Sequence, residues 1–242
     1  MLCYLKISTM ETNWKYDEFK QIGKDYSSQS EVDIYETSHS QFRDIRQEGI
    51  NLLENLKPTQ DDILVDFGCV TGIFCIEASK KCSKVYAVDI SKQMLSYAKA
   101  KSEKEKRTNI EFRHSGFLNF EIEDESVDCI TSTYSFHHLP DYWKGIALHR
   151  MIRMLKKGGT MYIKDVVISE ENSLQNIQNF ISSQKKLGGN FLKDDAETHF
   201  REEFSTYDWI LDGLITKVGF TITSKKTEIG LIAEYFCKKE IA

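Results

Sequence analysis

Short apolar runs alternate with amphipathic segments through the middle of the chain. The runs at 62–67, 84–89, 109–113, 127–132 and 160–167 have the length of buried strands. The segments 71–81, 91–105 and 141–156 carry apolar residues at helical spacing. Because alternating strands and helices build right-handed crossovers, the pattern predicts a parallel sheet with helices on both faces.

The alternation changes before and after this stretch. Apolar residues at spacings of three and four from Phe42 to Leu56 predict a helix that ends before Pro58. Residues 169–204 are polar and lack a clear strand pattern. Ser205 opens a capping-box-like start of a helix that runs to Lys217, and two strands then predict a hairpin at the sheet edge. We therefore expect an N-terminal helical lid segment (1–56), a core (57–168 and 205–242) and an inserted substrate cap (169–204).

The turn after the first predicted strand carries candidate chemistry. Gly68 and Gly72 give it backbone freedom, and Asp89 ends the next strand at the spacing expected of a ribose-binding acid. A dinucleotide site needs G-x-G-x-x-G, yet Val70 and Ile73 occupy the other two positions. The pattern indicates a different nucleoside-bearing cofactor. The alternative is an ordinary tight turn, with Asp89 as a helix cap.

This turn, Asp-Phe-Gly-Cys-Val-Thr-Gly, resembles the first motif of the class I S-adenosylmethionine (SAM) methyltransferases, D-x-G-C-G-T-G, with Val70 in place of the middle glycine. The resemblance covers roughly residues 57–240. It implies an α/β Rossmann-like fold with a mostly parallel seven-stranded sheet, helices on both faces and a C-terminal antiparallel hairpin. It also implies that SAM is the cofactor.

The resemblance assigns cofactor contacts to particular positions of this chain. The first turn would hold the methionine part, Asp89 the ribose, and Ile90 with Met94 the adenine. Ser115 and Gly116 would meet the adenine edge, and the carbonyl of Thr133 would face the sulfonium. The full set of expected cofactor residues is Asp66, Gly68, Cys69, Thr71, Gly72, Asp89, Ile90, Met94, Ser115, Gly116, Phe117 and Thr133.

His137-His138-Leu-Pro after the fourth strand resembles the corresponding segment of small-molecule methyltransferases of the ubiquinone and menaquinone type. Longer stretches around it and around Arg201 resemble a bacterial subgroup of that family. Methyl transfer is an in-line displacement that needs a base only when the acceptor must lose a proton of high pKa. The candidate catalytic residues are His137, His138 and Asp165. The alternative for each histidine is a hydrogen-bonded packing role.

Four further residues are candidates for contact with the acceptor. Tyr26 and Tyr35 are predicted lid residues whose ring faces would stabilise the sulfonium charge. His199 and Arg201, in the predicted cap, would meet an acidic group on the acceptor. Helix packing for the aromatic residues and pairing with Glu202 for Arg201 are the alternatives.

Composition limits the partners. The formal net charge of -5 and the pI of about 5.8 provide no long-range attraction for nucleic acid or anionic lipid. No C-x-x-C pair and no histidine at zinc-finger spacing occur, so no metal is expected. We expect a cytoplasmic enzyme on a small molecule, with its oligomeric state open. A SAM-binding module with little turnover and a protein or RNA methyltransferase remain alternatives.

Overall fold

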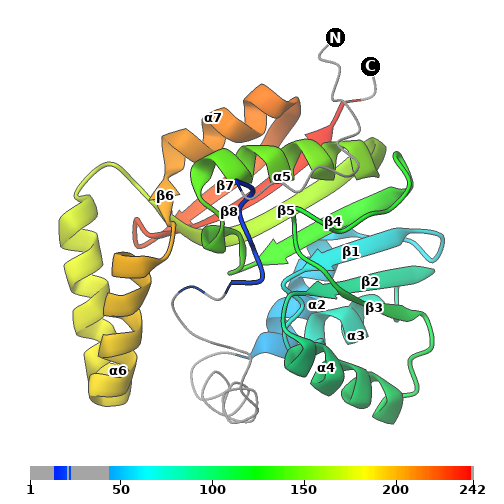
Figure 1. Cartoon of the computed structure of the whole chain (residues 1–242), viewed down its shortest axis with the longest axis horizontal. Coiled ribbons are helices and arrows are strands. Elements are labelled where there is room, and N and C mark those ends of the chain that lie inside the picture. Colours follow the sequence, from blue (N-terminus) through cyan, green and yellow to red (C-terminus); the bar gives the residue numbers. More distant parts are fainter. Residues whose placement is uncertain (1–13, 21, 23–43, 241–242) are drawn as a thin grey trace.

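A computed structural model describes residues 14–20, 22 and 44–240 of the chain (Figure 1). One twisted sheet forms its centre, with strand order β3-β2-β1-β4-β5-β8-β7 and with β6 paired to β5. The strands are β1 (Ile63–Phe67), β2 (Lys84–Asp89), β3 (Ile110–His114), β4 (Val127–Thr133), β5 (Leu155–Ile168), β6 (Thr206–Tyr207), β7 (Phe220–Glu228) and β8 (Ile232–Lys239).

The sheet confirms the predicted fold class. Strands β1 to β5 pair in parallel, and β8 lies antiparallel between β5 and β7. The helices are α2 (Ile45–Leu56), α3 (Ile73–Ala78), α4 (Lys92–Lys104), the 3-10 turn η1 (Phe136–His138), α5 (Asp141–Met154), α6 (Ser173–Glu202) and α7 (Asp208–Val218). In the described part of the chain, no helix is both long and apolar enough to cross a membrane.

Two apolar cores cover the two faces of the sheet. One joins α5 and α7 to the sheet through buried residues such as Leu148, Met151 and Leu211. The other joins α2, α3 and α4 to the opposite face through Leu53, Cys75 and Leu95. Figure 1 shows the two groups of helices on either side of the sheet. This layering leaves the carboxyl ends of β1, β2, β4 and β5 along one edge of the molecule.

Some element boundaries differ from the sequence-based prediction. The helix expected over 141–156 ends at Met154, because Leu155 takes an extended conformation and pairs with Val127. Ser205 does not begin a capping box. Instead Thr206 and Tyr207 pair with the end of β5, and α7 begins at Asp208 without a side-chain cap. Pairing with β5 therefore decides where this helix starts.

Residues 169–204 form a helical arm that stands away from the sheet (Figure 1). The helical conformation of α6 is interrupted at Gly188 and Gly189, and Gly189 has a φ of 66°. Two arms result, and the rings of Phe180 and Phe200 meet with 6.1 Å between their centroids. The polar sequence of this segment therefore belongs to a kinked helical hairpin with one apolar side.

Substitution of Gly72 tests the packing of the first turn against α4. Gly72 has a φ of 74°, and a Cβ there would lie 2.7 Å from the Cβ of Ala98 on α4. We expect Gly72→Ala to lower the free energy of unfolding by about 2–4 kcal/mol, because it adds both left-handed strain and overpacking. Urea denaturation measures this change.

Gly213 on α7 is the matched control, since a Cβ there would have no atom within 4 Å. Gly213→Ala should stabilise the protein by up to about 1 kcal/mol through helix propensity. Equal effects of the two substitutions would contradict the packing described for Gly72.

Candidate functional site

The carboxyl edge of the sheet opens into a cavity of about 550 Å³. One end is lined by the ends of β2 and β3, with Asp89 and Gly116 among the lining residues. The other end is lined by η1 and by α6. A second cavity of about 270 Å³ lies nearby, and Gly68, Val70 and Tyr134 line both. These three residues form the boundary between the two spaces.

The expected cofactor residues divide between these cavities. The larger one is lined by Gly68, Asp89, Ile90, Met94, Ser115, Gly116 and Phe117. The smaller one is lined by Asp66, Gly68, Cys69, Thr71 and Thr133. Gly72 lies behind the turn, where its α-carbon packs against α4. The adenosine residues and the methionine-tail residues of the expected set thus lie on opposite sides of the Gly68–Val70 turn.

Asp89 joins the turn to the second strand. Its Oδ2 accepts the N–H of Val70 at 2.9 Å, and its Oδ1 accepts the N–H of Ser91 at 2.8 Å. Burial raises its pKa despite these amide donors. The cap of α4 is the hydroxyl of Ser91, which accepts the N–H of Met94. Because each carboxylate oxygen has a further lone pair, Asp89 can still accept two hydroxyl groups from the cavity.

Asp66 has a bracing role in the first turn. It is buried, and it accepts hydrogen bonds from Thr131 Oγ1 at 2.7 Å and from Cys75 Sγ at 3.3 Å. Burial raises its pKa to about 7. The carboxyl group therefore links β1 to β4 and α3 beneath the smaller cavity.

Val70 holds a backbone conformation that favours glycine. Its φ is 48°, in the left-handed region that β-branched residues rarely adopt. This is the position of the middle glycine in the motif that the sequence resembles. The hydrogen bond from the Val70 amide to Asp89 holds the turn in this shape. The strain of such a residue costs about 1–2 kcal/mol.

Glu18 is a site residue that the sequence did not reveal. Its carboxylate accepts the N–H of Leu118 at 2.9 Å, and it lines the larger cavity. A Cβ at Gly116 would lie 2.2 Å from Glu18 Oε2. The Gly116 amide donates to Asn119 Oδ1 at 3.0 Å. Glu18 thus occupies the space that a side chain at position 116 would fill, and burial raises its pKa to about 7.

The segment that carries Glu18 reaches both ends of the larger cavity. Tyr16 donates its hydroxyl to the carbonyl of His138 at 3.0 Å. The rings of Phe19 and His114 meet with 5.0 Å between their centroids. Residues 14–20 therefore form a wall of the site. Tyr26 and Tyr35, the predicted lid residues, lie outside the described residues.

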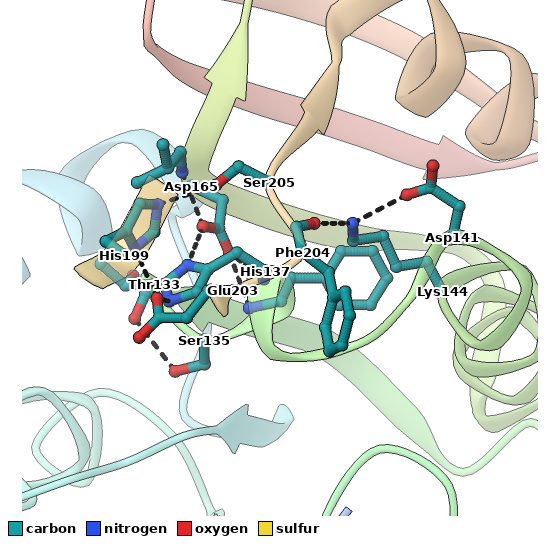
Figure 2. Close-up of polar contacts among 12 residues, drawn as sticks. Thr133, Ser135, His137, Asp141, Lys144, Asp165, His199, Glu203, Phe204 and Ser205 are labelled. Atoms are coloured by element: carbon teal, nitrogen blue, oxygen red, sulfur yellow. Dashed lines mark hydrogen bonds and ion pairs between the residues drawn. The ribbon is translucent and has the colours of Figure 1, made fainter. Parts of the chain in front are cut away.

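At the opposite end, His137 lies between two carboxylates (Figure 2). Its Nδ1 is 2.5 Å from Asp165 Oδ1, and its Nε2 is 3.1 Å from Glu203 Oε2. Burial lowers the pKa of His137, but Asp165 and Glu203 outweigh burial and raise it to about 9. Both ring nitrogens are engaged, so in this arrangement His137 does not act as a base near neutral pH.

Asp165 and His138 are two neighbours of His137 that help to determine the charge at this end of the cavity. Asp165 Oδ2 also accepts the N–H groups of Phe136 at 2.6 Å and of His137 at 3.2 Å. Burial would raise the pKa of Asp165, but His137 outweighs burial and lowers it. Burial and the charge of His137 lower the pKa of His138 to about 4. His138 is therefore a neutral imidazole in the cavity lining.

The two predicted cap residues differ in their placement. His199 lines the larger cavity, where its Nδ1 contacts Glu203 and its Nε2 lies 2.8 Å from Ser205 Oγ. Arg201 is exposed and pairs with Glu202 at 2.9 Å, which is the alternative considered for it. The carboxylates on this side of the cavity are therefore those of Glu203 and Asp195, neither of which sequence patterns singled out.

A buried lysine anchors Glu203. Lys144 is 2% exposed; its Nζ bonds Asp141 Oδ1 at 2.9 Å and also contacts the carbonyl of Phe204 (Figure 2). The amide of Phe204 donates to the carbonyl of His137 at 2.9 Å. Thr206 adds a hydrogen bond to Asp141 at 3.0 Å. These contacts hold the end of α6 against η1 and so fix Glu203 beside His137.

The wall between α6 and the sheet is mostly apolar. The α6 residues that line it include Phe180, Leu187, Phe191, Leu192, Ala196 and Phe200. They face the histidine and carboxylate group at the end of the same cavity. Such a space suits a molecule with an apolar body and one polar end.

Comparisons with known proteins identify methyltransferases as relatives of this chain. Residues 64–159 match the family model described as a methyltransferase domain. A protein of Anoxybacillus flavithermus, named an uncharacterized methyltransferase, is 28% identical over 209 residues, which cover 85% of this chain and 91% of that one. A Bacillus mycoides protein of the same description is 27% identical over 183 residues, 76% of this chain and 81% of its own.

Solved structures share the fold at low sequence identity. A SAM-dependent methyltransferase from Aquifex aeolicus has a TM-score of 0.61 at 18% identity, over 88% of this chain and 98% of that chain. A phosphoethanolamine N-methyltransferase of Haemonchus contortus has a TM-score of 0.67 at 15% identity, over 89% of this chain and 58% of that chain. Residues 64–159 are therefore similar to a methyltransferase domain, and the described part of the chain has the fold of the class I SAM-dependent methyltransferases.

The strain at Val70 is open to a direct test. We expect Val70→Gly to raise the free energy of unfolding by about 0.5–1 kcal/mol, because relief of the left-handed conformation outweighs the entropy that glycine loses on folding. Val70→Ala keeps a Cβ and should recover less. Chemical denaturation of the three proteins measures the order. Destabilisation by the glycine variant would show that the turn does not carry this strain.

Proposed function

We propose that this protein transfers the methyl group of SAM to a small molecule whose reacting atom lies beside the histidines of η1. One observation carries the proposal. A single cavity connects Asp89 and its neighbours, which are expected to bind the adenosine part of SAM, to His137, His138 and His199. A methyl donor and an acceptor can therefore lie end to end in the same space. Alignment in such a space supplies most of the acceleration that methyl transfer requires.

The residues present fit SAM at the adenosine end. Asp89 offers two carboxylate oxygens at the end of β2 for the ribose hydroxyls. Ile90 and Met94 provide apolar contacts for the adenine ring. The methionine tail would lie along the turn toward Asp66, Thr71 and Thr133, which line the smaller cavity. When bound, SAM supplies a methyl group that is already activated on its sulfonium.

Glu18 can accept the adenine amino group, since the turn after β3 carries no acidic residue for that contact. In the family that the sequence resembles, an aspartate after this strand accepts the adenine amino group. The carboxylate of Glu18 lies against Gly116 and Leu118 in that turn. An acceptor from the N-terminal segment can therefore serve the same purpose. Ser115 lines the same space and remains a second acceptor.

The acceptor end supports a small molecule. The wall from α6 is mostly apolar, with Gln184 and Asp195 as polar members, and the histidines and Glu203 lie at η1 and near the end of α6. The neutral His138 offers a ring nitrogen to a donor group on the acceptor. His137 and Asp165 would act through position and charge, since each is engaged with the other. The formal charge of -5 argues against an RNA acceptor.

Turnover is tested with methyl-labelled SAM and a panel of small acceptors that carry hydroxyl, thiol, amine or activated carbon groups. Label transfer to one apolar member of the panel is the expected result. SAM binding without transfer to any acceptor would favour a SAM-binding module. Labelling of protein or RNA alone would point to a macromolecular methyltransferase.

Asp89→Ala should weaken SAM binding by at least about 10–100-fold, because charge-assisted hydrogen bonds to the ribose are lost. Isothermal titration calorimetry measures the affinity, and circular dichroism checks the fold. Asp195→Asn is the matched control, since Asp195 lines the same cavity from α6. Unchanged SAM affinity in Asp89→Ala would refute the ribose assignment.

Glu18→Ala should weaken SAM binding by about 10-fold, since the adenine amino group would lose its acceptor. Glu18→Gln keeps a carbonyl oxygen and should retain part of the affinity. Binding of a SAM analogue with a carbonyl in place of the amino group gives the control, because that analogue should not respond to Glu18→Ala. Equal losses for both ligands would indicate a purely structural role.

A further inference from the structure

Three metal-ligating side chains converge at the acceptor end of the larger cavity. His137 and His138 come from η1, and Glu203 follows α6. One potential ligand atom from each lies within 4.8 Å of the other two. The spacing of ligands along the sequence did not predict a metal, because Glu203 is brought to the histidines only by folding.

The distances suit a cation between these groups. The Nε2 of His137 and Oε2 of Glu203 are 3.1 Å apart. Metal–ligand bonds of about 2.0–2.2 Å place neighbouring ligand atoms about 3.0–3.5 Å apart. His138 packs against His137 with 4.3 Å between ring centroids, and one of its ring nitrogens lies within 4.8 Å of the other two ligand atoms.

Hydrogen-bonding partners hold both His137 and Glu203 in place, as is usual for the ligands of a metal. Asp165 holds the Nδ1 of His137 at 2.5 Å, which directs Nε2 into the cavity. A carboxylate that fixes the outer nitrogen of a histidine is the usual partner of a metal-bound imidazole. Glu203 is positioned by His199, which Ser205 holds in turn.

We propose that His137, His138 and Glu203 bind one divalent transition-metal ion, with open positions directed at the methyl acceptor. Two imidazoles and one carboxylate favour an ion such as Zn²⁺, Mn²⁺ or Fe²⁺ over Ca²⁺ or Mg²⁺, which prefer oxygen ligands throughout. Two carboxylates, Asp165 and Glu203, flank the His137 ring and balance the charge of the ion.

A role for the ion rests on the proposed function. An acceptor hydroxyl or thiol that coordinates a divalent cation loses its proton to solvent more readily. Its oxygen or sulfur then forms a bond to the methyl carbon while the bond from that carbon to the sulfonium sulfur breaks. S-adenosylhomocysteine leaves as a neutral thioether. The ion would thus take the place of a general base.

Cobalt(II) added to the metal-free full-length protein tests the site without SAM or acceptor. We expect one equivalent to bind with visible absorption bands of a nitrogen- and oxygen-ligated ion. His138→Ala and Glu203→Gln should each weaken this binding by at least 100-fold. Asp165→Asn, which neutralises the carboxylate that orients His137 but keeps a hydrogen-bonding side chain there, should weaken it by about 10–100-fold. His149→Ala on α5, a histidine outside the cluster, should leave binding unchanged.

Thermal melting of each variant separates loss of the site from loss of the fold. No stoichiometric cobalt binding by the wild-type protein would overturn the proposal, as would binding that survives both His138→Ala and Glu203→Gln. SAM binding by calorimetry is measured separately on the same metal-free protein. A metal-free protein that binds SAM and transfers methyl groups would refute the role of the ion in the reaction and leave the proposed function intact.

Discussion

One buried carboxylate, that of Asp165, fixes the histidine-lined end of the larger cavity. It accepts the backbone N–H groups of Phe136 and His137 and the ring nitrogen of His137, so strand β5 holds the turn that follows β4. Burial of an ionised group is costly unless it is paired and hydrogen-bonded, and here every contact lies in η1 or in β5 itself. The position of both histidines therefore depends on this one side chain. Through the His137 carbonyl, it also sets the place of Phe204 and so of Glu203.

The ends of the cavity are completed by segments outside the sheet. Residues 14–20 bring Glu18 to the turn after β3, and the end of α6 brings Glu203 to η1. The carboxyl edge of the sheet positions Asp89 and the first turn. Binding groups on such additions can change while the core stays the same, which is how one fold serves many acceptors. In the function that we propose, the apolar arm of α6 is accordingly the part that would contact the acceptor.

The pattern of apolar residues was sufficient for the architecture. Strands β1, β2 and β4 are mostly buried, so each contains a short apolar run that local inspection can find, whereas β3 at the sheet edge is only partly buried. The ends of α5 and α7 were less predictable, since Leu155 and Thr206 are drawn into pairs with other strands. The hairpin form of α6 was also hidden, because its apolar side becomes evident only when its two arms face each other.

Some residues of the candidate site could be found from the sequence, and others could not. Gly68, Val70 and Asp89 form a local constellation, because a strand, a turn and the next strand end must follow one another at fixed spacing, and residue order alone was enough to locate it. The contacts of Glu18 with Leu118, of Lys144 with Phe204 and of Glu203 with His137 join residues that are far apart in the chain, and no periodicity marks them. Their roles arise from burial beside particular backbone groups, and only the packing of the N-terminal segment and α6 against the sheet decided those contacts.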